Sequence, residues 1–339
     1  MSKLSVLAMV GLLVGLAAIP AAASGPPNPG TGSSDFYVLN VDGANSATVN
    51  VNYYGQNGVS DATDSILLNP YGSREFASGT LPVGDGWVGA VVLSSDRELA
   101  ASTNIVWTGG QHADGITAGA YGGVSLPESS LYFPYITRLV DKRFSTLTIQ
   151  NAGTGDAAIE VRYYRKDGYL QAGPIFDTIG QGRSKTFDLS TPGGKVPDLP
   201  SGTTGFQGAV VITADKPIAG TVTNHWRSYS SAYEGFSGGS QDQYLPSVFR
   251  VKHPTDHDWL RHSNILIQNL SGSDAVVDID FYKTGETSSK LHLDDTIPAN
   301  SSHEYNTRFG NPGLFDPSVF EAALGDDFDG SVVVQANHE

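Results

Sequence analysis

Alternating apolar and polar residues recur three times along the chain, at a spacing of about 110–120 residues. The segment ATVNVNYY (47–54) returns as AAIEVRYY (157–164) and as VVDIDFY (276–282). In the first copy Val49, Val51 and Tyr53 share one face, and polar residues occupy the other. A period of two with one polar face is typical of a half-buried β-strand.

Further strand patterns flank each copy in the same order. Each copy begins with a strand that ends in Asn (36–40, 145–151 and 263–269) and later has a Ser-x-x-aromatic turn. An aromatic-x-Gly strand follows, whose glycines are Gly89, Gly208 and Gly330. A glycine inside a strand marks a bulge or a close backbone approach. In the first two copies a last strand ends at Trp107 and Trp226, after predicted turns at 95–96 and 214–215.

A repeat of this length is a whole small domain, so the chain is expected to be a tandem array. Short alternating strands with turns every 8–12 residues favour an antiparallel immunoglobulin-like sandwich. We therefore predict an all-β fold with three tandem immunoglobulin-like β-sandwich domains. The expected segments are a signal peptide (1–23), a Pro/Gly-rich linker (24–34) and repeats at 35–124, 125–243 and 244–339.

The first residues have the pattern of a secretory signal peptide. Lys3 precedes an uncharged apolar stretch (4–19), and Ala21-Ala22-Ala23 offers a small-residue cleavage site. Export with cleavage is the prediction, and a retained anchor is the alternative. No second apolar run reaches membrane length, so we expect a secreted, extracellular cell-surface protein without a membrane span in the mature chain.

The two ends of the array depart from the repeat. Pro-containing apolar segments (133–138 and 245–250) precede the second and third copies, and the first copy lacks one. Such a segment could close the preceding unit or open the next. The third copy stops at Glu339, where the others continue into the Trp-ended strand. An unpaired sheet edge would result. The chain is then a fragment of a longer one, or a neighbouring molecule supplies the strand, or a short unit is tolerated.

Composition narrows the classes of function. The chain has 35 acidic and 20 basic residues, a formal net charge of −15, which argues against binding nucleic acid because phosphate contacts need Lys and Arg. It has no Cys, which removes thiolate catalysis, Cys-ligated zinc and disulfides. There is no nucleophile elbow and no zinc protease motif, and the acidic positions differ between copies, so we predict no enzyme activity.

Two acidic or His-rich clusters are candidate metal sites. His253, Asp256 and His257 (with His262) form the densest set, but Pro254 makes their spacing that of a loop, and a solvated loop is the favoured interpretation. Asp residues at 326, 327 and 329 resemble part of a calcium loop, but the other copies lack them, and a polar turn is favoured. No metal and no cofactor is therefore predicted.

Aromatic residues supply the candidate ligand-binding positions. Trp259 has no counterpart in the other copies, and Tyr229 and Tyr233 lie in a connector, so these three are the candidates for stacking on sugars. Trp107 and Trp226 occupy matching strand ends, where closure of the core is expected.

The motifs together resemble a tandem immunoglobulin-like β-sandwich repeat of secreted and cell-surface proteins of filamentous bacteria. The segments that carry the resemblance lie at 145–151, 157–164, 184–187 and 206–222. The resemblance implies a non-catalytic structural protein, such as a filament, sheath or surface-layer subunit, whose partners are other copies or other surface components. An adhesin or carbohydrate-binding array that binds surface glycans, and an accessory region of an extracellular hydrolase, remain alternatives.

Overall fold

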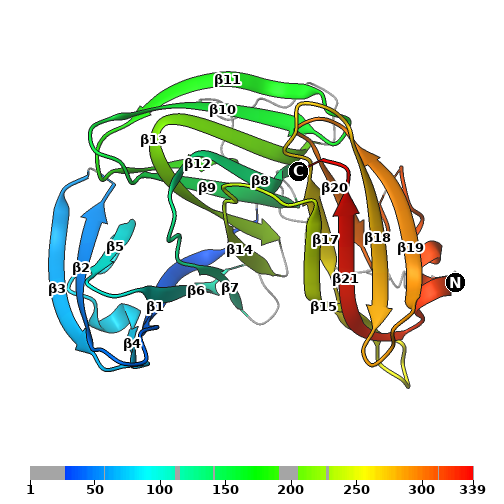
Figure 1. Cartoon of the computed structure of the whole chain (residues 1–339), viewed down its shortest axis with the longest axis horizontal. Helices are drawn as coiled ribbons and strands as arrows, with labels where there is room; N and C mark the ends of the chain where they lie inside the picture. Colours follow the sequence, from blue (N-terminus) through cyan, green and yellow to red (C-terminus); the bar gives the residue numbers. More distant parts are fainter. Residues whose placement is uncertain are drawn as a thin grey trace, which may run out of the picture.

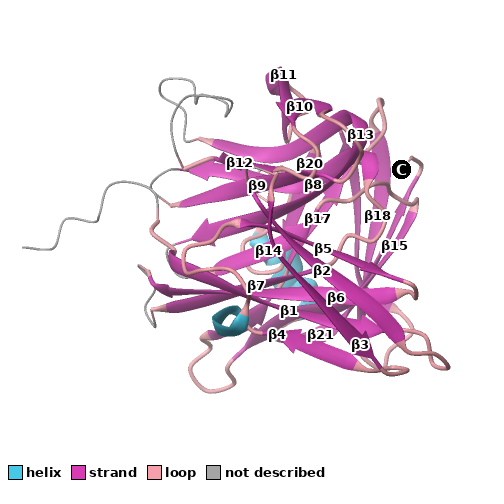
Figure 2. Cartoon of the chain, turned by 90° about the vertical axis from the view of Figure 1, so that its left-hand side faces the viewer, coloured by secondary structure: helices cyan, strands magenta, loops and turns pink. Residues whose placement is uncertain are grey.

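The computed structural model describes residues 27–56, 58–110, 115–139, 142–190, 205–226, 229–311 and 313–338. Almost all regular structure in that part of the chain is strand, and every strand pairing that joins its sheets is antiparallel. The predicted all-β class is therefore confirmed (Figures 1 and 2). The predicted signal peptide lies outside the described residues.

The first unit, β1–β7, has two sheets around one hydrophobic cluster. One sheet has the order β4-β1-β6-β7, and the other has the order β3-β2-β5. Phe36, Val51 and Tyr53 lie in the cluster between them. The strands are β1 (Gly30–Asn40), β2 (Ala47–Gly55), β3 (Ser60–Leu68), β4 (Ser73–Phe76), β5 (Gly89–Ser95), β6 (Leu99–Gly109) and β7 (Ile116–Gly122), and a 3-10 turn spans Ser78–Thr80.

The second unit, β8–β14, repeats this plan with one long strand in place of two. The N-terminal half of β13 pairs with β10 and β8, and its C-terminal half pairs with β9 and β14. The predicted turn at 214–215 is therefore not a break, since β13 runs through it with only a register shift. The strands are β8 (Glu128–Leu139), β9 (Arg143–Asn151), β10 (Ala157–Arg165), β11 (Leu170–Ile179), β12 (Ser184–Asp188), β13 (Phe206–Trp226) and β14 (Ser230–Glu234).

The third unit, β15–β21, has a five-stranded sheet of order β16-β15-β21-β18-β19 and a separate pair, β17-β20. The sequence did not predict its short helix α1. Asp316 caps the first turn of this helix by accepting a hydrogen bond from the Ser318 amide, and Phe320 packs into the hydrophobic cluster of the unit. The elements are β15 (Asp242–Lys252), β16 (Trp259–His262), β17 (Asn264–Gln268), β18 (Ala275–Lys283), β19 (Ser289–Ile297), β20 (Ser302–Asn306), α1 (Pro317–Leu324) and β21 (Asp327–Ala336).

The Pro-containing segments open the following unit and do not close the preceding one. The first of them lies in β8, which pairs with β13, and the second lies in β15, which pairs with β21. Figure 1 shows the resulting arch, with the second unit between the first and third. The sequence alone had left both possibilities open.

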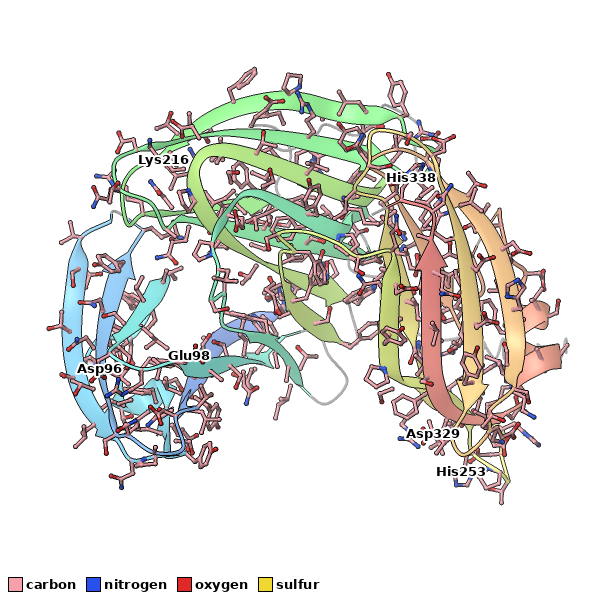
Figure 3. All side chains as sticks on the ribbon, in the orientation of Figure 1. Asp96, Glu98, Lys216, His253, Asp329 and His338 are labelled. Carbon is pink, nitrogen blue, oxygen red and sulfur yellow. The ribbon has the colours of Figure 1, made fainter. Side chains whose placement is uncertain are left out.

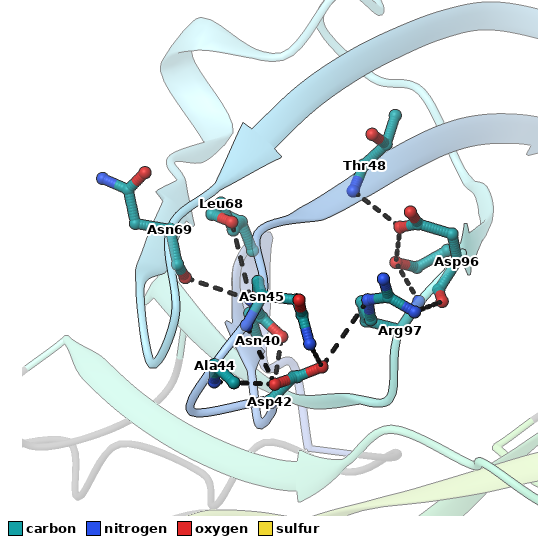
Figure 4. A network of polar contacts seen from close by, with 10 residues as sticks. Asn40, Asp42, Ala44, Asn45, Thr48, Leu68, Asn69, Asp96 and Arg97 are labelled. Carbon is teal, nitrogen blue, oxygen red and sulfur yellow. Dashed lines mark hydrogen bonds and ion pairs between the residues drawn. The ribbon is translucent and has the colours of Figure 1, made fainter.

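One buried asparagine closes the same corner in each unit. Asn40 Nδ2 donates to the carbonyls of Asn45 (2.8 Å) and Asn69 (3.1 Å), and its Oδ1 accepts from the Asp42 amide (Figure 4). Asn151 and Asn269 make the corresponding bonds. The Asn at the end of β1 and β9, and directly after β17, is thus a structural residue that satisfies backbone groups at the sandwich end.

The three repeated glycines mark close backbone approaches, one of the two possibilities that the sequence left open. A Cβ atom on Gly208 would lie 2.0 Å from the Tyr164 carbonyl oxygen, and one on Gly330 would lie 2.0 Å from that of Tyr282. Gly89 stands in the same relation to Tyr54, at 2.2 Å. Any side chain at these positions would force neighbouring strands apart.

Candidate functional site

The first candidate surface is the free edge of β5 in the first unit. β5 pairs with β2 and with no other described strand, whereas the equivalent strands β13 and β21 are also covered by β8 and β15. Val92 on β5 exposes 37% of its surface and the preceding Val88 exposes 64%. An exposed strand edge with apolar neighbours is a template for pairing with another chain.

The second candidate surface is the free edge of β17 in the third unit. β17 pairs only with β20 among the described strands, although β6 and the C-terminal half of β13 fill the matching place in the other units. A mostly apolar groove of about 190 Å³ lies beside it, lined by core side chains that include Leu245, Val277 and Val334. Tyr132 and Phe236 of the second unit also line the groove, and no described strand occupies the place beside β17.

Two polar side chains support this description of the groove. Gln268 lines it, and both its amide atoms are buried without a hydrogen-bond partner. Such an unsatisfied buried group costs free energy. Asn337 Oδ1 accepts from the Val276 amide at 2.8 Å, as Asp96 does from Thr48 and Asp215 from Ala158. Asn337 thus makes the hydrogen bond that Asp96 and Asp215 make just before the last strand segment of the first and second units.

The predicted stacking residue Trp259 lies at the start of β16 and is partly buried. Three cations cover its ring: Arg250 Cζ lies 5.1 Å, Lys252 Nζ 5.2 Å and Arg308 Cζ 5.2 Å from the ring centroid. This is cation–π packing around a structural residue. Trp259 as a sugar-stacking residue stays a prediction.

Tyr229 and Tyr233 lie close together along the chain but have different environments. Tyr233 donates a hydrogen bond from its hydroxyl to the Tyr135 carbonyl at 2.7 Å, and its ring packs against the hydrophobic cluster of the second unit. Burial raises the pKa of the Tyr233 hydroxyl. Tyr229 stacks on Trp226 with ring centroids 4.5 Å apart and still exposes 48% of its surface. The structure therefore leaves Tyr229 as the predicted aromatic residue with the greatest access.

The predicted His-rich loop does not gather its side chains around one point. His253 Nδ1 lies 3.2 Å from Asp256 Oδ1, while His257 turns away toward Asp326, at 3.8 Å. The three acidic residues that precede Gly330 also diverge, because each faces a different cation. Asp326 pairs with Arg250 (2.7 Å), Asp327 with Lys283 (2.8 Å) and Asp329 with Arg261 (3.8 Å). Figure 3 shows His253 and Asp329 at the same end of the third unit.

Sequence reasoning missed one convergent cluster, on the outer face of β18 and β19. The side-chain atoms of Asp278, His292 and Asp294 that could bind a metal lie within 4.8 Å of one another. His292 Nδ1 is 3.2 Å from Asp280 and its Nε2 is 3.0 Å from Asp294, and the hydrogen bond with Asp280 raises the pKa of His292. The hydrogen bond with Asp294 raises the pKa of Asp278. Hydrogen bonds link these side chains to one another.

A buried polar network between the second and third units was also missed. His303 on β20 is 5% exposed, and its two ring nitrogens face Asp295 and the Lys166 carbonyl. Ser302 donates to the Pro134 carbonyl at 2.5 Å across the same boundary. The sequence signal was present in the Ser-x-x-aromatic motif, where the second unit has Lys185 at the position of His303.

No family model matches the sequence, and no curated protein matches it either. Among solved structures, the Anabaena sensory rhodopsin transducer is 24% identical over 29% of this chain and 97% of its own, with a TM-score of 0.23. So small a TM-score carries no argument about this protein. Among the described residues, no helix has the length and apolar character that crossing a membrane requires.

Proposed function

We propose that the chain is a non-catalytic subunit of an extracellular structural assembly, built from three immunoglobulin-like sandwich domains. The observation that carries the proposal is the pair of incomplete edges, β5 in the first unit and β17 in the third. Edges of this kind in the first and last units of an array suit heterologous contacts that propagate head to tail. The β17 edge of one copy would then meet the β5 edge of the next.

Self-association accounts for features that a monomer leaves unexplained. The apolar groove beside β17 opens onto the third core, and the buried Gln268 amide beside it lacks a partner. A strand added along β17 would cover the apolar groove and could supply hydrogen bonds to the Gln268 amide. The acidic surface, with a net charge of −15, favours solubility until specific edges meet.

Edge variants test the proposal. Leu266→Lys places a charge on β17, and Val92→Lys places one on β5; both should abolish polymers seen by sedimentation and electron microscopy, because edge lysines prevent strand pairing. Val276→Lys is the matched control, since Val276 is 48% exposed on the internal strand β18. A wild-type chain that stays monomeric at all concentrations, or edge variants that polymerise normally, would refute the proposal.

Binding to a surface glycan is the second candidate function, and the Tyr229–Trp226 stack favours it. Exposed aromatic rings are common sugar-stacking platforms because their faces are apolar and rigid. Tyr229→Ala should then weaken co-sedimentation with cell-wall polysaccharide about tenfold, a loss of about 1.4 kcal/mol. Tyr71→Ala is the control, because Tyr71 is 71% exposed in the first unit. Equal binding by both variants would exclude the stack as a glycan site.

A further inference from the structure

The second and third units meet through side chains far apart in the sequence. The β10–β11 turn of the second unit packs against the third, so that a Cβ atom on Gly168 would lie 2.8 Å from Pro298. Glu304 on β20 accepts from Lys166 Nζ at 3.4 Å and from Gln207. His303 lies in the middle of this contact and is almost completely buried.

Both hydrogen-bond partners of His303 are acceptors. Nδ1 lies 2.7 Å from Asp295 Oδ2 in its own unit, and Nε2 lies 3.1 Å from the Lys166 carbonyl oxygen of the second unit. A neutral imidazole has one N–H, and only the protonated ring donates from both nitrogens. The contacts are therefore complete only when His303 carries a proton.

The surroundings of Asp295 keep it an acceptor. Burial alone would raise its pKa, but hydrogen bonds from His303 and from the Tyr305 hydroxyl (2.5 Å) leave the pKa lowered. Of the other charged groups near the contact, Lys166 and Glu304 pair with each other, and Arg143 hydrogen-bonds to Gln207. Because Asp295 stays ionised, the group at this contact whose protonation can change is His303.

The repeat supplies an independent argument that this position takes a cation. Lys185 on β12 of the second unit matches His303, and it pairs with Asp177 on β11, which matches Asp295. Lys remains charged at physiological pH, whereas His loses its charge between about pH 5 and about pH 8. The third unit therefore has a histidine where the second has a lysine.

We propose that protonated His303 is a pH-dependent clamp between the second and third units, which holds them docked in acid and releases them as the pH rises. Deprotonation leaves one N–H on the ring. The ionised Asp295 is the stronger acceptor for it, so the Lys166 carbonyl across the boundary loses its hydrogen bond from His303. The loss of one such bond corresponds to about a tenfold or larger shift toward the undocked state. The clamp goes beyond the proposed assembly function and does not depend on it.

Distance measurements between the two units test the clamp. The chain has no Cys, so spin labels can be attached at Phe176→Cys on β11 and Val276→Cys on β18, both exposed. Labelled chain diluted into unlabelled chain reports only distances within one molecule. We expect one narrow distance at about pH 5 and a broad distribution at about pH 8. A narrow distance that is unchanged between the two conditions overturns the proposal.

Variants separate the clamp from general pH effects. The His303→Gln variant should give a broad distribution of label distances at both pH values. The His303→Lys variant should give a narrow one at both. The control His292→Gln, which alters an exposed histidine of the third unit, should respond as the wild type does. A His303→Gln chain that keeps the wild-type response contradicts the clamp. If that variant fails to fold, ¹⁵N NMR of wild-type His303 decides, because a neutral ring in the docked state at about pH 5 also overturns it.

Discussion

Each unit depends on a few polar side chains that hydrogen-bond to its backbone. The corner asparagines are 0–2% exposed, and each bonds to carbonyls both in the next turn and at the end of β3, β11 or β19. Asn suits this position because its amide donates two hydrogen bonds while its carbonyl oxygen accepts one. An aliphatic residue would fill the space but leave backbone groups buried and unpaired.

Asn40→Ala should lower the free energy of unfolding of the first unit by about 2–4 kcal/mol, because two carbonyls and one amide lose their partner. Chemical denaturation followed by tryptophan fluorescence measures this change. Asn50→Ala is the control, since Asn50 is exposed on the polar face of β2 and its loss should cost less than about 0.5 kcal/mol. Similar effects of both substitutions would show that the corner bonds add little stability.

At the scale of the strands, the alternating pattern predicted much of what the structure contains. The buried faces of β2, β10 and β18 follow the predicted period of two. The continuity of β13 was not predictable, because Asp96 and Asp215 make the same hydrogen bond while only the first unit breaks its strand there. The helix α1 was missed because it is short and occurs in one copy only.

Gly330→Ala should destabilise the third unit by about 1–3 kcal/mol, because the added methyl group would strike the Tyr282 carbonyl and force β21 away from β18. Thermal unfolding checks this expectation. Gly272→Ala is the matched control in the same unit, since a Cβ atom there meets nothing within 4 Å. If the two variants melt at the same temperature, β21 has more freedom to shift than the structure indicates.

At the scale of the whole molecule, the three units differ more in what surrounds them than in how they fold. Among the described strands, none opens the first unit as β8 and β15 open the others, and none pairs with β17 as β6 and β13 pair with β1 and β9. Counting motifs predicted these differences. The His303 contact was not predictable, because His303 and Lys166 are 137 positions apart. The alternation of apolar and polar residues along a strand does not indicate which units contact each other. Likewise, the sequence could not show that Tyr233 uses its hydroxyl inside the second unit.

The most direct test of head-to-tail assembly is a disulfide between the two open edges. The natural chain has no Cys, so chains with Val92→Cys and chains with Leu266→Cys can be mixed under oxidising conditions without background pairing. We predict a covalent dimer that joins the two different variants, identified by mass spectrometry of the linked peptides. Absence of that dimer, or equal yields when Val276→Cys replaces either partner, would contradict assembly through β5 and β17.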